Sequence, residues 1–235
     1  MRSALIFLFS MVAFLGLQGV ASAGVNTQTA NITVYKINLY PNADCTGTAQ
    51  TILDVSGGQS FDMAASPTLT SSSVTDGTYN CFAMKMSDNV TFTPAADTGT
   101  NCVAGTSYTI DVCKPISDGS GGTLTPYYYN PEGGSTPSDA AGYSACTTGN
   151  DTVWVFVSTT STATAGSSGH NAFAPPNSSG SCQYSGDPSP GCGFKLSNAI
   201  TVSGNTTGTF VFDTDGKVQD SNGACDMEAP NFGYE

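Results

Sequence analysis

Residues 32–40 read Ile-Thr-Val-Tyr-Lys-Ile-Asn-Leu-Tyr, and this stretch decides the fold class. β-Branched and aromatic residues dominate it, and successive side chains of a β-strand face opposite sides of a sheet. Strict alternation assigns the stretch to two faces, Ile32, Val34, Lys36 and Asn38 on one and Thr33, Tyr35, Ile37 and Leu39 on the other. The stretch therefore predicts a β-strand, and no helical periodicity competes with it.

Period-two segments recur along the chain between turn residues. Ser56-Gly57-Gly58, between residues 51–55 and 59–63, predicts a hairpin. Ser87-Asp88-Asn89 predicts a turn or bulge between residues 79–86 and 90–93. Further strands are expected at residues 107–113, 153–158, 194–202 and 208–213. About eight to ten strands predict an all-β fold, which we expect to be an antiparallel Greek-key-like sandwich.

The N-terminus has the features of a secretory signal peptide. Arg2 supplies positive charge, residues 4–17 form an apolar core, and Ala21-Ser22-Ala23 is a cleavage motif. The apolar core is shorter than the roughly 18 residues that span a bilayer. We therefore expect a signal peptide over residues 1–23, no transmembrane anchor, and a mature protein that is secreted, held at the cell surface or periplasmic.

The charge of the chain excludes one class of partner. Its 18 acidic residues face six basic ones, a formal net charge of −12, and Arg2 is the only arginine. Nucleic-acid binding requires several cations to neutralise phosphates, so we expect no nucleic-acid partner. Outside the cell, the acidity favours solubility and repulsion between molecules.

Two segments, residues 115–150 and 159–193, are rich in Gly, Ser and Pro. Both exceed the roughly 12–15 residues beyond which a loop is usually functional or disordered. Because they carry cysteines, we expect disulfide-stapled loop insertions in a single all-β domain over residues 24–235. The alternative is two small β domains split near residue 118.

The cysteines predict a disulfide framework. Eight cysteines in a chain with a signal peptide predict four disulfides and no free thiol. Zinc is disfavoured, because the chain has no Cys-x-x-Cys pair and a single histidine. Short separations favour Cys102–Cys113 and Cys182–Cys192, which leaves Cys45–Cys81 and Cys146–Cys225 as the longer-range bonds.

One short segment has a family resemblance. Asp76-Gly77-Thr78-Tyr79, leading into an alternating strand, resembles the Gly-Thr-Tyr strand start of prealbumin-like, Ig-like and other bacterial extracellular β-sandwich modules. Residues 36–40 before Cys45, with Phe61-Asp62 after it, are similar to secreted bacterial envelope proteins. The resemblance covers about fifteen residues and implies a sandwich fold, but no functional residue.

Catalytic residues are scarce. His170 is the only histidine and lies in a Gly- and Ser-rich segment, whereas a Ser or Cys nucleophile normally needs a basic partner. Most aspartates lie beside Gly, Asn or Ser, where aspartate forms turns. We therefore expect a protein that is not an enzyme.

The acidic run Asp213-Thr-Asp215-Gly216-Lys-Val-Gln-Asp220 has two interpretations. Its carboxylates are hard oxygen ligands of the kind that Ca²⁺ prefers. An Asp-Gly hairpin turn explains the same residues. A calcium site at Asp213, Asp215 and Asp220 is the only cofactor hypothesis that the sequence offers.

Aromatic residues suggest a binding surface. Pro126 and Pro131 hold Tyr127, Tyr128 and Tyr129 in an extended segment, which could stack on sugars or pack against a protein. Alternatively, these tyrosines cover the sandwich edge. Trp154 lies in a run that is apolar on both faces, so we expect it in the core.

These features favour a noncatalytic structural or interaction protein at the cell surface, such as an extracellular filament subunit or an adhesin. Its expected partners are other protein subunits, including copies of itself, because the polar segment Gly24–Asn31 could extend outward and pair with a neighbour's sheet edge. The alternatives are a carbohydrate-binding module that uses Tyr127–Tyr129 on polysaccharide and, third, a secreted hydrolase with paired carboxylates.

Overall fold

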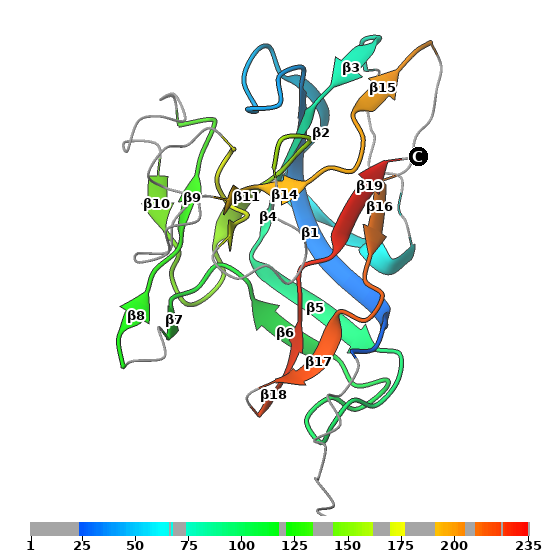
Figure 1. Ribbon diagram of the computed structural model, residues 1–235, viewed down its shortest axis with the longest axis vertical. Helices are drawn as coiled ribbons and strands as arrows, with labels where there is room; N and C mark the ends of the chain where they lie inside the picture. Colours follow the sequence, from blue (N-terminus) through cyan, green and yellow to red (C-terminus); the bar gives the residue numbers. More distant parts are fainter. Residues whose placement is uncertain are drawn as a thin grey trace, which may run out of the picture.

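The computed structural model of the 235-residue chain describes residues 24–65, 67, 74–117, 121–133, 143–161, 170–176, 191–204, 210–221 and 223–234. The expected signal peptide, residues 1–23, lies outside this range. The described residues contain β-strands, one 3-10 turn and no α-helix (Figure 1). The prediction of an all-β protein is confirmed. Within the same residues, no helix is long and apolar enough to cross a membrane.

The first half of the chain supplies the longest strands. They are β1 (Thr27–Tyr40), β2 (Gln50–Asp62), β3 (Gly77–Tyr79), β4 (Cys81–Ser87), β5 (Asn89–Pro94) and β6 (Tyr108–Asp111), with the 3-10 helix η1 (Met63–Ala65) after β2. Short strands follow in the first insertion: β7 (Ile116–Ser117), β8 (Thr123–Leu124), β9 (Tyr127–Tyr129) and β10 (Tyr143–Ala145).

The second half of the chain adds one long strand and several short ones. They are β11 (Thr152–Ser158), β12 (His170–Asn171), β13 (Gly191–Cys192), β14 (Phe194–Lys195), β15 (Ile200–Val202), β16 (Phe210–Asp213), β17 (Val218–Ser221), β18 (Ala224–Met227) and β19 (Asn231–Tyr234). The expected strand at residues 194–202 is therefore two short strands, β14 and β15.

Strand β1 organises the main sheet. Seven strands form this sheet in the order β14-β11-β4-β1-β5-β6, with β2 also paired to β1. The three strands that pair with β1 are all antiparallel to it, and β14 is parallel to β11. The strand predicted at residues 32–40 is confirmed and begins earlier, at Thr27.

A β-bulge at Tyr35 changes which residues of β1 face the core. The register with both β2 and β4 shifts between Val34 and Lys36. One extra residue turns every following side chain to the other face. Val34, Ile37 and Leu39 thus join the same hydrophobic core, whereas Lys36 lies on the opposite face. The predicted two-face assignment is wrong beyond Tyr35.

The predicted hairpin at Ser56-Gly57-Gly58 is also wrong. Both halves of β2 pair with β1, from Asn31 opposite Asp62 to Leu39 opposite Gln50. The glycines lie instead in the stretch of β2 that bulges opposite Tyr35. β1 offers one long antiparallel ladder to the whole of β2, and this ladder replaces the short one that the two halves could form with each other.

The predicted turn or bulge at residues 87–89 is confirmed. β4 pairs with one half of β1 and β5 with the other, so residues 81–94 follow β1 with a single break at Asp88. Beyond this break the sheet has different neighbours, because β11 pairs with β4 and β6 pairs with β5. Asp88 is fully buried at the break.

Hydrophobic residues cover both faces of the sheet. On one face, β4 packs against the β16–β19 ribbon, with the Phe82 and Phe210 rings 4.6 Å apart. On the other face, Trp154 and Phe156 form a second cluster with Tyr129 from β9. Figure 1 places β9–β10 and β16–β19 on opposite sides of β4 and β11. The prediction that Trp154 lies in the core is confirmed.

Three disulfides join described cysteines: Cys45–Cys81, Cys102–Cys225 and Cys113–Cys146. Cys45–Cys81 was predicted correctly, but Cys102–Cys113 and Cys146–Cys225 are wrong. β6 lies between Cys102 and Cys113, and a strand advances about 3.3 Å per residue, so it carries the two cysteines apart. Such disulfides are typical of compartments outside the reducing cytosol.

The fourth predicted disulfide is only partly visible. Cys192 is disulfide-bonded, whereas its expected partner, Cys182, lies outside the described residues. No described cysteine is free.

The N-terminal segment Gly24–Asn31 does not extend outward. Val25 exchanges two backbone hydrogen bonds with Val218, of 2.8 and 2.9 Å. Residues 27–31 form the first part of β1 and pair with β5 of the same chain. The expectation of a free arm for strand exchange is wrong, because this segment already has partners within its own chain.

Candidate functional site

Charged residues gather at one level of the main sheet, on the face turned toward the first insertion. Lys36 of β1 lies opposite Asp54 of β2 on one side and opposite Lys85 of β4 on the other. Lys85 in turn lies opposite Trp154 of β11. The bulge at Tyr35 turns Lys36 to this face. Four strands thus bring two lysines, a carboxylate and an indole into one row.

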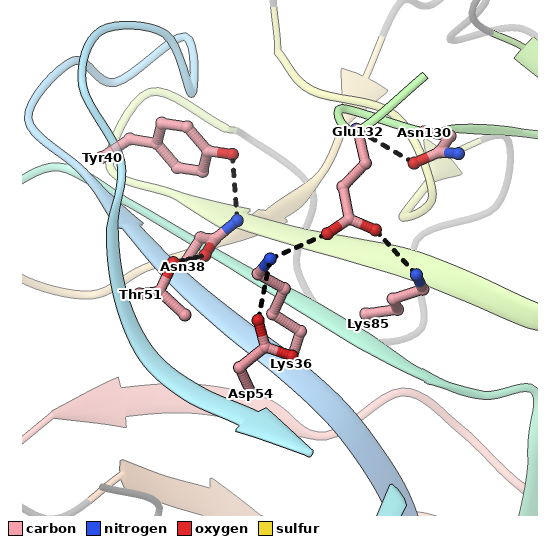
Figure 2. A network of polar contacts seen from close by, with 8 residues as sticks. All are labelled: Lys36, Asn38, Tyr40, Thr51, Asp54, Lys85, Asn130 and Glu132. Carbon is pink, nitrogen blue, oxygen red and sulfur yellow. Dashed lines mark hydrogen bonds and ion pairs between the residues drawn. The ribbon is translucent and has the colours of Figure 1, made fainter. Parts of the chain in front are cut away.

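Glu132 forms ion pairs with both lysines, and Asp54 supplies the second negative charge. Like charges directly opposite each other in a sheet are destabilising. Figure 2 shows the Glu132 carboxylate between the two ammonium groups. Lys36 Nζ donates to its Oε1 at 2.9 Å, and Lys85 Nζ donates to its Oε2 at 2.7 Å. Lys36 Nζ also forms an ion pair with Asp54 Oδ2, at a distance of 3.1 Å. The four groups, here named the lysine–carboxylate cluster, carry no net charge.

The first insertion positions Glu132. The Glu132 backbone N–H donates to Asn130 Oδ1 at 3.0 Å, and Gly133 N–H donates to the Asn130 carbonyl at 3.1 Å, which forms a turn (Figure 2). Just before this turn, Tyr129 is buried, and its ring lies 5.2 Å from Tyr143 and 6.1 Å from Phe156. The turn therefore has a packed base, which aims Glu132 at the sheet.

A disulfide closes the same insertion at its ends. Cys113 follows β6 and Cys146 follows β10, so their bond joins the two ends of residues 114–145. Cys146 N–H also donates to the Pro126 carbonyl at 2.9 Å. The insertion that carries Glu132 is thereby held at its base as well as at its tip.

A second polar row lies next to the lysines. Thr51 Oγ1 donates to Asn38 Oδ1 at 2.8 Å, and Asn38 Nδ2 lies 3.4 Å from the Tyr40 hydroxyl oxygen (Figure 2). Asn38 and Tyr40 are both buried. Burial raises the pKa of Tyr40 above its ordinary value, so the phenol stays protonated. These contacts orient the Asn38 amide between two partners.

The electrostatics of the cluster keep its paired groups charged. The hydrogen bond to Glu132 raises the pKa of Lys36 above its ordinary value, against the effect of burial. Burial alone would raise the pKa of Glu132, but hydrogen bonds from Lys85 and Lys36 outweigh it and hold this pKa below its ordinary value. Proton transfer near neutral pH requires shifts in the opposite directions. The ion pairs of Lys36 and Lys85 with Glu132 therefore stay charged near neutral pH.

A cavity of about 310 Å³ adjoins the cluster. Its lining combines the four charged side chains with neighbouring strand residues, namely Tyr35, Val55, Ser56 and Thr152. Lys85 Nζ also lies 6.0 Å from the centroid of the buried Trp154 ring, within the range of a cation–π interaction.

Asp88 forms a separate buried acidic group at the break between β4 and β5. Its Oδ1 accepts from Asp151 N–H at 2.8 Å, whereas its Oδ2 is buried without a hydrogen-bond partner. Burial, with smaller contributions from Asp111 and Asp151, raises the pKa of Asp88 to about 6. Ser87 Oγ and Asn150 Oδ1, 2.7 Å apart, join the same two segments beside it.

The three predicted platform tyrosines lie in different environments. Tyr127 is 47% exposed, Tyr128 is half-buried and Tyr129 is 5% exposed. They form strand β9 and pair with β10. A platform of three exposed rings is therefore wrong, because Tyr129 belongs to the core; Tyr127 alone presents an open ring.

The predicted calcium ligands have separate partners. Asp213 accepts from Asp215 N–H and from Asn231 Nδ2, and Asp220 accepts from the backbone and side chain of Asn101. In the described part of the chain, no three His, Cys, Asp or Glu side chains are grouped to hold a metal ion. Gly216 has a positive φ of 68° in the turn before β17. The structure thus has a turn at Asp215-Gly216, but the predicted hairpin is wrong, because β16 pairs with β19 and β17 pairs with β18.

Sequence reasoning missed the lysine–carboxylate cluster. Lys36, Lys85 and Glu132 lie in three distant segments, and only strand register and the docking of the insertion bring them together. One signal was available: beyond residue 23 the chain has only five lysines, and two of them interrupt otherwise apolar strands. His170, the expected loop histidine, forms part of β12, and its side chain lies outside the described part.

The comparisons with known proteins add no relative to this picture. No protein-family model, curated protein or solved structure matches the chain.

Proposed function

We propose that this chain is a noncatalytic structural or interaction protein, exported and displayed at the cell surface as a filament subunit or an adhesin. The observation that carries the proposal is the lysine–carboxylate cluster, in which paired charges hold an insertion on the sheet and stay ionised at neutral pH. Such a cluster serves to fix a surface feature in place. The disulfide at the base of the same insertion supports this role.

The proposal includes a specific architecture. We propose a Greek-key-like sandwich in which the main sheet is one layer and the C-terminal ribbons form the other. The shared core supports it, since Phe212 of β16 and Phe232 of β19 pack 5.0 Å apart and belong to the same cluster as β1 and β4 residues. A rigid sandwich with disulfide-closed insertions suits a protein exposed outside the cell.

The test measures assembly and turnover on the same material. Chains starting at Gly24, produced under oxidising conditions, are examined by light scattering and negative-stain microscopy, and are incubated with polysaccharide and peptide substrates. We expect assembly or retention on a surface ligand without release of product. The variants Glu132→Gln and Asp215→Asn form a matched pair, because each removes one carboxylate and only Glu132 belongs to the cluster. Time-dependent product release that Glu132→Gln alone abolishes would overturn the proposal.

Carbohydrate binding is the second candidate, and the exposed Tyr127 ring favours it. Sugars stack on open aromatic faces, and Tyr127 is one of two large exposed hydrophobic residues in the described part of the chain. Retention on a polysaccharide column should then fall at least about tenfold in Tyr127→Ala. Val103→Ala, the change at the other exposed hydrophobic residue, should retain binding. Equal retention of both variants would exclude Tyr127 as the contact.

A further inference from the structure

The methionines of the chain are gathered in one place. The sequence has six, of which Met1 and Met11 lie in the expected signal peptide. The other four, Met63, Met84, Met86 and Met227, all line a single cavity of about 520 Å³. Methionine is flexible and polarisable, and it is over-represented on binding surfaces that adapt to apolar ligands. Four methionines from three distant segments thus meet at one site.

This cavity lies between the two layers of the protein. Its floor is the core face of the main sheet, with Ala30 of β1 and Val155 of β11. Phe212 of β16 and Phe232 of β19 line the opposite side, and Phe173 lines it as well. Most of these side chains are buried, and the cavity is a mainly apolar cleft that opens to solvent on one side.

The cavity is partly open to solvent, so a small molecule can enter it. An apolar ligand there releases water from the methionine and phenylalanine side chains, which is favourable. Small-molecule sites range from about 300 to 1,000 Å³ and are mostly apolar. The volume and lining therefore fit an apolar molecule.

Charged residues also line part of the cavity, and they restrict the head group that a bound molecule can carry. Three acidic residues, Asp111, Asp226 and Glu228, and one basic residue, Lys114, are among the residues that line the cavity. Asp226 is exposed, so this charged part of the lining reaches the surface. An acidic opening repels a carboxylate or sulfate head group and favours an uncharged or cationic one.

We propose that this methionine-lined cavity binds a small amphiphile with an apolar body and an uncharged or cationic head group. The proposal is independent of the lysine–carboxylate cluster, which lies on the opposite face of the main sheet. The apolar body contacts the methionines and phenylalanines, and the head group lies beside Asp226 and Glu228.

The four methionines provide the readout. The protein from Gly24 onward, labelled with ¹³C in its methionine methyl groups, is titrated with decyltrimethylammonium, decanol and decanoate, each below its micellar concentration. We expect saturable shifts of the methionine signals with the cationic and neutral probes. Decanoate should bind at least about tenfold more weakly. No shift with any probe, or shifts that never saturate, would overturn the proposal.

Two variants separate the apolar and charged parts of the site. Ala30→Phe fills the cavity and should abolish binding of all three probes. Asp226→Lys should reverse the preference toward decanoate, whereas Asp215→Lys, an exposed aspartate outside the lining, should leave the order unchanged. If Ala30→Phe does not fold, the order of probe affinities in Asp226→Lys decides whether the cavity binds the amphiphile. A preference that is the same in Asp226→Lys and Asp215→Lys would contradict a head-group position at this opening.

Discussion

Glu132 links two positions of the sheet that would otherwise repel each other. Lys36 and Lys85 are 21% and 30% exposed at their side chains, so solvent screens their repulsion less than it would at the open surface. Surface ion pairs usually contribute little, but several charges in one network contribute more than an isolated pair. One carboxylate that serves two ammonium groups is such a network.

Replacing Glu132 should therefore destabilise the fold. Glu132→Gln keeps the shape but leaves two ammonium groups opposed, and we expect the free energy of unfolding to fall by about 1–2 kcal/mol. Chemical denaturation at low and high salt measures it, and the loss should shrink at high salt. Adding Lys85→Met to Glu132→Gln should recover part of the loss. A Glu132→Gln protein as stable as the original would contradict the role of this carboxylate.

Asp88 should make stability depend on pH. Its pKa is raised to about 6 in the folded protein, so the folded state binds the proton more tightly than the unfolded state. The resulting stability is fully present below about pH 4 and is lost as the pH rises through 6. We expect a loss of about 2–3 kcal/mol over this range.

The variant Asp88→Asn isolates this contribution. An amide cannot ionise, so the pH dependence between 4 and 7 should flatten, and the variant should be more stable than the original above pH 7. Asp215→Asn, at an exposed aspartate, should keep the original pH dependence. Parallel pH profiles for Asp88→Asn and the original protein would show that another group is responsible.

Among the strands, the paired bulges of β1 and β2 determine which side chains reach the cluster. Gly58 has a positive φ of 73°, and a Cβ there would lie 2.7 Å from Thr33 Cγ2 and 2.9 Å from the Tyr35 ring. Gly105 has the same φ, but nothing lies within 4 Å of its Cβ position. The two glycines thus share a backbone conformation, but only Gly105 has room for a side chain.

This difference gives a matched comparison. Gly105→Ala should cost about 1 kcal/mol, the penalty for a side chain in the left-handed region. Gly58→Ala should cost at least about 1 kcal/mol more, because Thr33 or Tyr35 must move. Thermal or chemical denaturation measures both variants. Equal losses would mean that the bulge has room for a side chain.

The first insertion depends on its disulfide. Replacing Cys113 and Cys146 together by alanine removes a bond that spans 33 residues, and we expect a loss of about 3 kcal/mol. Hydrogen exchange should accelerate at Tyr129 N–H, which donates to the Phe173 carbonyl at 2.8 Å. The β1–β4 ladder should stay protected. Uniform acceleration in both regions would contradict a local role for this bond.

The sequence predicted the strands better than their partners. β1, β11 and β16 were found because β-branched and aromatic residues concentrate there. The pairing of both halves of β2 with β1 was missed, since a Ser-Gly-Gly segment suits a hairpin and a bulge equally well. The Tyr35 bulge was missed for a similar reason: alternation in one strand does not reveal a register shift in its neighbours.

At the scale of the whole molecule, long-range contacts determine the rest. Cysteine separation favoured Cys102–Cys113, but an intervening strand moves these residues apart and Cys102 meets Cys225 instead. The cluster of Lys36, Lys85 and Glu132 likewise depends on how an insertion folds back over the sheet. Both features require the assembled fold, which local patterns in the chain do not describe.

Two regions of the protein are stabilised by side-chain packing together with a disulfide. One lies under the first insertion and the other lies under the C-terminal ribbons. Both combine a packed aromatic cluster with a disulfide nearby. This construction suits a protein that keeps its shape outside the cell, and it underlies the proposed role at the cell surface.

The most direct test of that role is immunogold electron microscopy of intact cells that produce the full-length chain, with antibodies raised against the described domain. We expect gold particles on the outer surface of unpermeabilised cells, along filaments or in patches. We also expect a mature N-terminus at Gly24 in the same material. Labelling that appears only after permeabilisation, within the cytoplasm, would contradict the proposed role at the cell surface.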